Sequence, residues 1–107
     1  MNPPVQKETK TSVEQLLKER VIRYRSITQQ ALAKINIIAK KDTKEGTIAM
    51  DYMTMANNYF NDAIHFQEQG DDILALAAFS YAHAWLDAGV RAGLFDGKED
   101  DRLFTLP

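Results

Sequence analysis

The chain has 107 residues, which suits one domain of ordinary size, and its 45% hydrophobic and 26% charged residues are typical of a globular protein. It has no cysteine, which excludes disulfides and thiolate metal sites, and its net charge is only −2. The longest strongly apolar run, residues 73–78, is too short to span a bilayer, and residues 1–10 lack the apolar core of a signal peptide. We therefore expect a cytoplasmic protein without membrane contact.

The N-terminal part of the chain predicts a loose tail followed by a long helix. Residues 1–10 contain two prolines and almost no hydrophobic anchor, which indicates a flexible tail. Thr11 can cap a helix, and Glu14 three positions later completes a capping box. Up to Lys41 there is no glycine or proline, and apolar residues recur at gaps of three and four. The sequence therefore predicts an amphipathic first helix over residues 11–41.

A polar break then predicts a second helix. Gly46 is expected to supply the conformational freedom that the turn needs, and Thr47 can cap a helix that runs to about Gln69. Gly70 is expected to end this helix in a left-handed conformation, and Asp71 to cap the next one.

The third predicted helix, about 72–92, is apolar on most sides, so we expect its neighbours to cover it most fully. Residues 94–107 form a C-terminal extension whose Leu103, Phe104 and Leu106 can dock on the helices. No strand alternation appears. Three helices joined by short loops predict an all-α protein, an up-down-up antiparallel three-helix bundle over residues 11–93 with a long first helix.

The second half of the chain resembles a known family. Tyr59, Asp62 and Ala63 form a Tyr-x-x-Asp-Ala segment, a Gly-Asp turn follows, and residues 81–89 read Tyr-Ala-His-x-x-Leu-Asp-Ala-Gly. These marks resemble a family of small archaeal proteins classed only as a domain of unknown function and described as three-helix bundles. The match spans residues 56–97. The resemblance implies an archaeal source and the bundle fold, and it brings no activity.

His83 and Asp87 lie in the most apolar helix, four residues apart and so on one face. One interpretation is a polar site, because such a pair can act as a general base or supply two metal ligands. The other is a buried structural pair, with Asp87 bonded to His83 or to Tyr24, Tyr52 or Arg91, because an unpaired buried carboxylate is costly. We favour the structural interpretation and expect no metal, since a zinc site normally needs three protein ligands. No catalytic motif is present, and we expect no cofactor and no catalytic activity.

The charge is distributed unevenly along the chain. Residues 1–47 hold ten Lys/Arg against five Asp/Glu, and residues 48–107 hold three against ten. One interpretation is a basic surface on the first helix for nucleic acid or another anionic partner, formed by Lys18, Arg20, Arg23 and Arg25. The other is that basic and acidic helices lie side by side and attract each other.

The predicted lengths also suggest an interaction surface. Residues 11–41 make a helix of about 46 Å, roughly 10 Å longer than the second, and the excess falls at its beginning. This overhang holds Val13, Leu16 and Leu17. The helix can bend, or the segment from Leu103 to Leu106 can reach back to cover them; the alternative that we favour is a protein partner, most simply a second copy in a homodimer. The sequence thus predicts a helical bundle that acts through protein–protein contact; the alternative is a nucleic-acid-associated protein that uses the basic first helix.

Overall fold

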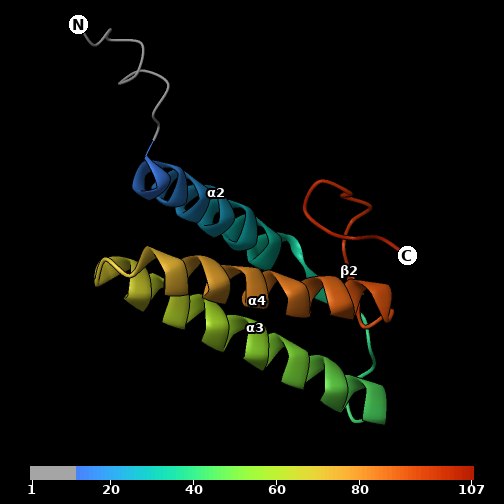
Figure 1. Ribbon diagram of the computed structural model, residues 1–107. Coiled ribbons are helices and arrows are strands. Elements are labelled where there is room, and N and C mark those ends of the chain that lie inside the picture. The colour runs from blue at the N-terminus through green and yellow to red at the C-terminus, as the bar shows by residue number, and fades with distance from the viewer. Residues whose placement is uncertain (1–11) are drawn as a thin grey trace, which may run out of the picture.

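The computed structural model describes residues 12–107, so the predicted flexible tail over 1–10 and the predicted cap Thr11 lie outside the described residues. Three helices, α2 (Val13–Lys34), α3 (Lys44–Glu68) and α4 (Asp72–Arg91), run up, down and up (Figure 1). Two short strands, β1 (Asn36–Ile37) and β2 (Phe95–Asp96), pair antiparallel. The predicted up-down-up three-helix bundle is confirmed, with a first helix of 22 residues.

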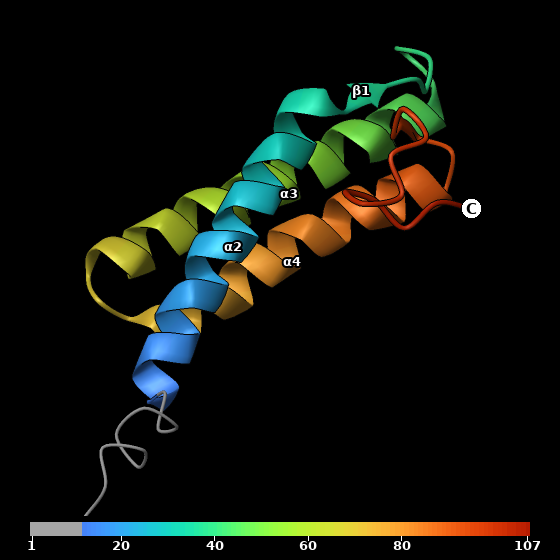
Figure 2. The ribbon, with the colours of Figure 1, turned by 90° about the horizontal axis from the view of Figure 1, so that it is seen from above.

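The helix α4 lies at the centre of the bundle. It packs along α3 as an antiparallel hairpin and also packs against α2, whereas α2 and α3 hardly touch each other. Figure 2 shows α2 crossing α4 obliquely, so that the N-terminal end of α2 projects beyond α4 on the side that faces away from α3. The sides of α4 that face α2 and α3 are therefore covered, and the opposite side is not.

Small residues explain how α3 and α4 approach each other. Ala49, Ala56 and Ala63, seven residues apart on α3, are completely buried, as are Ala75 and Ala82 on α4. An alanine fills little space, so it lets two helix backbones come close. Larger side chains then fill the rest of the core, among them Phe79, Phe95, Leu86 and Val21, which are all fully buried.

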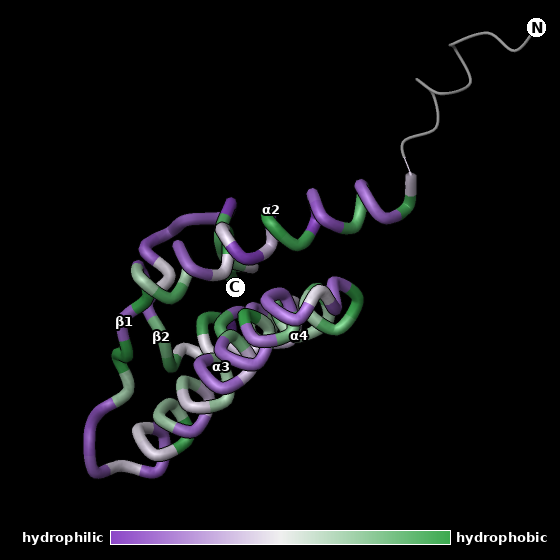
Figure 3. The backbone as a smooth tube through the Cα atoms, turned by 90° about the vertical axis from the view of Figure 1, so that its left-hand side faces the viewer, coloured by the Kyte–Doolittle hydropathy of each residue, from purple (hydrophilic) through white to green (hydrophobic). Residues whose placement is uncertain are grey.

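The first helix ends seven residues earlier than predicted. It begins after Ser12, whose side chain accepts a hydrogen bond from the backbone N–H of Gln15 (3.1 Å), and it stops at Lys34. Ile35 is buried and extended, with ψ at 143°. It opens an isoleucine-rich segment, and β-branched residues favour strands over helices. The segment pairs with β2 instead of continuing the helix, and Ile38 N–H donates to the Leu94 carbonyl (2.9 Å). In Figure 3 each of these two strands includes a green, hydrophobic part of the tube next to a purple, hydrophilic one.

The role predicted for Gly46 was wrong. Gly46 lies in the first turn of α3 and is buried, and a Cβ atom there would overlap the backbone carbonyl of Lys40. Glycine is needed at this position because two backbones approach closely, not because the turn needs freedom. The cap is Thr43 instead of Thr47, and its hydroxyl accepts from Gly46 N–H (3.0 Å).

The predicted end of α3 and both predicted ends of α4 are confirmed. Gly70 adopts φ 79°, and the Asp71 side chain accepts from Leu74 N–H (3.1 Å) to cap α4. Gly93, with φ 76°, follows the end of α4, where Leu94 N–H donates a hydrogen bond to the Gly89 carbonyl (2.9 Å). This last bond turns the chain towards β2, which positions the C-terminal extension.

The C-terminal extension docks on the bundle as predicted, with Leu103 and Phe104 buried and Leu106 half-buried. Asp100 fixes its turn, because its carboxylate accepts from the backbone N–H groups of Arg102 (3.0 Å) and Leu103 (3.1 Å) and from the Lys34 ammonium of α2 (2.7 Å). The hydrogen bond from Lys34 holds the pKa of Asp100 below its usual value, and the two backbone hydrogen bonds add to this effect. An ion pair thus joins the basic α2 to the acidic end of the chain.

Candidate functional site

The imidazole of His83 connects three parts of the fold. Its Nε2 lies 2.5 Å from the carbonyl oxygen of Leu103, and its Nδ1 lies 3.1 Å from the hydroxyl of Thr28 in α2. A carbonyl oxygen can only accept, so Nε2 carries a hydrogen and donates it. In the neutral ring Nδ1 then accepts from the Thr28 hydroxyl, which is completely buried. His83 thereby satisfies a buried hydroxyl and anchors the C-terminal extension.

Asp87 holds the next residues of the same extension. Its Oδ1 accepts from the backbone N–H of Thr105 (2.9 Å) and lies 3.9 Å from Nε2 of His83, too far for a hydrogen bond. Thr105 was not among the partners predicted for Asp87. The side chains of His83 and Asp87 are 15% and 28% exposed. Since both ring nitrogens have partners and the carboxylate is engaged, the geometry favours a structural role for the pair.

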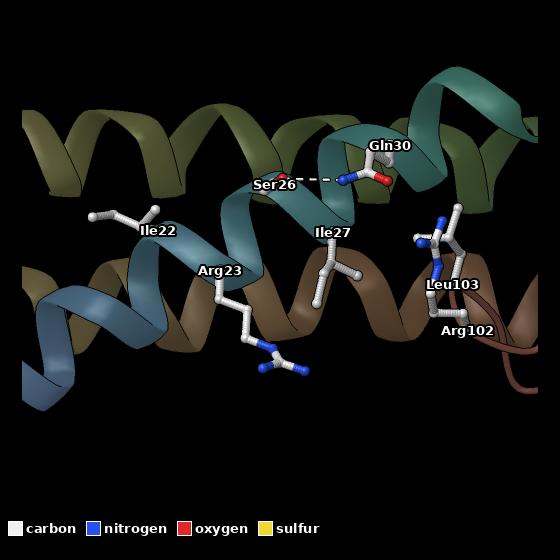
Figure 4. Close-up of a pocket in the computed structure, with 7 residues that line it drawn as sticks. All are labelled: Ile22, Arg23, Ser26, Ile27, Gln30, Arg102 and Leu103. Atoms are coloured by element: carbon white, nitrogen blue, oxygen red, sulfur yellow. Dashed lines mark hydrogen bonds between the residues drawn. The ribbon is translucent and has the colours of Figure 1, made fainter.

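A shallow hollow lies beside this network, between α2 and the extension. It has a volume of about 330 Å³, and Figure 4 shows Arg23 and Arg102 among its lining residues. Ile27 and Leu103 form its apolar part, and Ser26 accepts a hydrogen bond from the side chain of Gln30 (3.1 Å) at its edge. None of its lining residues is acidic. A second hollow of about 240 Å³ shares both arginines and reaches His83, Asp87 and Asp101.

The four basic residues singled out on the first helix separate into two pairs. Lys18 forms an ion pair with Asp72 (3.6 Å), and Arg25 donates to the side chain of Gln67 (2.8 Å). These two contacts agree with the interpretation that basic and acidic helices attract each other. Arg20 and Arg23 are exposed. Arg102, in the C-terminal extension, lines the same hollow as Arg23.

The predicted overhang at the start of α2 exists for a different reason. With 22 residues α2 is shorter than α3, which has 25, so the argument from length was wrong. The end projects because α2 crosses α4 obliquely (Figure 2). Val13 is 80% exposed and Leu16 is also exposed, whereas Leu17 is half-buried against the core around Val21. The exposed apolar surface of the overhang is therefore that of Val13 and Leu16.

The uncovered side of α4 is a larger apolar surface, which the sequence reading missed. Ile73 is 71% and Tyr81 is 60% exposed, although α4 is, as expected, the helix with the most buried residues. The helix is long and apolar enough to cross a membrane by length and composition, and only 39% of its most apolar stretch is buried. The uninterrupted apolar run 73–78 is only one part of this apolar helix. We call the exposed residues on this side the outer face of α4: Ile73, Ala77, Ser80, Tyr81, Ala84 and Ala88.

The described part of the chain holds no group of three or more His, Asp or Glu side chains arranged to bind a metal ion. Its notable surfaces are thus the outer face of α4, the end of α2 and the hollow beside the arginines. A helical bundle with such surfaces belongs to the broad class of small α-helical domains. More particularly, the chain belongs to the family described as a protein of unknown function (DUF357), which matches residues 23–95 and so includes most of α2. No curated protein and no solved structure matches the chain.

Proposed function

We propose that this protein acts through contact with another protein, and that the outer face of α4 makes that contact. The observation that carries the proposal is the exposure of a continuous surface without charged residues on the most apolar helix. Ile73 and Tyr81 lie on this face together with three exposed alanines. The ring of Tyr81 stacks on Tyr59 of α3 (centroids 5.2 Å apart) but stays 60% exposed, and the other residues of the face are exposed as well. Contiguous exposed apolar surface of this kind marks an interaction site in a soluble protein, because leaving it in water is unfavourable.

The end of α2 extends the same surface. Val13 and Leu16 are exposed where α2 projects past α4, on the side that faces away from α3 (Figure 2). A partner seated on the outer face of α4 therefore has the projecting end of α2 within reach. This arrangement supports a single contact surface formed by two helices.

Recovery of partners from the host of the protein tests the proposal. We expect Ala77→Glu combined with Ala84→Glu to abolish copurification of the partners, because two carboxylates would be buried in an apolar contact. Asn61→Glu is the matched control, since it adds a carboxylate to an exposed position on α3 and should change nothing. Equal recovery of the same partners by both variants would refute the proposal, provided that circular dichroism shows intact helices.

A second candidate, binding of nucleic acid, is favoured by one observation: Arg102 of the extension joins Arg23 around a hollow without acidic lining residues (Figure 4). Arginine suits phosphate because its guanidinium donates hydrogen bonds in pairs.

We expect Arg23→Glu with Arg102→Glu to abolish any RNA or DNA band shift, and binding to weaken steeply as salt rises. Because Lys18 is paired with Asp72, Lys18→Glu is not a suitable control, and Glu99→Gln, at an exposed position in the extension, serves instead. A band shift that survives the double substitution would exclude this surface.

A further inference from the structure

We propose that the partner on the outer face of α4 is a second copy of the same chain, whose own outer face packs against it in antiparallel orientation about a two-fold axis. This inference rests on the proposed function and names the partner. A two-fold contact requires that one surface be complementary to itself. The sequence of α4 and its placement in the bundle meet this condition in shape and in charge.

The outer face of α4 is a continuous stripe. At 100° per residue its six residues fall within an arc of about 100° on the helix. Every one of them is exposed, and none is charged. Between Asp72 and Arg91 the only charged residue of α4 is Asp87, whose carboxylate is engaged by Thr105 of the extension. A partner helix can therefore lie along nearly the whole of α4 without burying a charge.

The outer face of α4 is complementary to the outer face of a second copy in one antiparallel register. When Ala77 of one copy opposes Ala84 of the other, the same register places Ile73 opposite Ala88 and Ser80 opposite Tyr81. Each large side chain then meets a small one, which lets two helices pack closely. A parallel arrangement would instead oppose isoleucine to isoleucine and tyrosine to tyrosine.

The charges at the ends of α4 favour the same orientation. In this register Arg91 of one copy, whose guanidinium also donates to the Leu106 carbonyl of its own chain, lies opposite Gly70 of the other. It is then beside Asp71, which caps α4, and Asp72, which pairs with Lys18. Antiparallel helices also place each positive helix N-terminus near a negative C-terminus. The projecting ends of α2 lie on the open side of α4 (Figure 2), so that each can extend over the other copy with Val13 and Leu16.

The absence of cysteine makes a direct test possible, because any introduced cysteine is the only thiol in the chain. Position 80 lies next to the proposed two-fold axis, so Ser80→Cys should form a disulfide-linked dimer under mild oxidation. Asn61→Cys, at an exposed position on α3, is the matched control and should remain unlinked. Linkage of both variants at the same rate would show only random collision and would overturn the proposal.

Light scattering after size exclusion gives an independent readout on the unmodified chain. We expect a dimer at high-micromolar concentration that Ala84→Glu converts to a monomer with unchanged helical content. A monomeric wild-type chain overturns the second-copy proposal. If Ala77→Glu with Ala84→Glu still abolishes copurification of host partners, the face binds a different protein and the proposed function stands. Binding of the monomer to phospholipid vesicles that Ala84→Glu abolishes would instead identify a membrane-binding face and would refute both.

Discussion

Phe95→Ala should lower the free energy of unfolding by about 3–5 kcal/mol, the usual cost of removing a buried phenylalanine side chain. Phe95 is 2% exposed and lies in β2, where its ring packs against the core beside α4. Its removal leaves a cavity at the point where the β1–β2 pair is held to the helices. Urea denaturation followed by circular dichroism measures the change. A loss below about 1 kcal/mol would mean that this site collapses easily, contrary to the packing described.

Gly89→Ala provides the matched control for this contact. Alanine normally favours a helix over glycine by about 1 kcal/mol, but a Cβ atom at position 89 would overlap the ring of Phe95. The steric effect should prevail, so we expect Gly89→Ala to destabilise the protein by about 1–3 kcal/mol. With Phe95→Ala already present, the same change should become neutral or stabilising. Additive effects of the two substitutions would show that the two residues do not act on each other.

The helix order and most helix ends could be predicted because they depend on nearby residues. Gly70 and Asp71 end one helix and start the next through contacts within five residues of each other. The end of α2 could not be predicted in this way. No glycine or proline between Lys34 and Lys41 ends the helix, and its isoleucines favour a strand only weakly. The chain leaves the helix because Ile35 is buried and β1 pairs with β2, some sixty residues later in sequence. Long-range pairing overrode the local periodicity.

The candidate surfaces show the same limit. His83 and Asp87 could be recognised from their spacing. Thr105 and Arg102 could not be found, because their contacts depend on how the extension folds back over α2 and α4. The outer face of α4 was missed for a different reason. The helix α4 was expected to be the one that its neighbours cover most fully, and it is, but two neighbouring helices still leave one side of it open.

His83→Ala should destabilise the protein through the groups that it leaves without partners. The hydroxyl of Thr28 is completely buried and donates to Nδ1 of His83, and the Leu103 carbonyl accepts from Nε2. A buried polar group without a partner costs about 1–3 kcal/mol. We therefore expect a loss of that size in the free energy of unfolding, and faster proteolysis of the C-terminal extension, which loses one of its anchors.

Thr28→Val distinguishes this structural role from simple loss of the imidazole's packing. Valine matches threonine in shape but lacks the hydroxyl, so it removes the group that His83→Ala would leave unsatisfied. In the Thr28→Val background, His83→Ala should therefore cost less than in the wild type, by about 1 kcal/mol or more. Identical costs in the two backgrounds would show that the bond between Thr28 and His83 contributes nothing. His83 would then hold the extension through Leu103 alone.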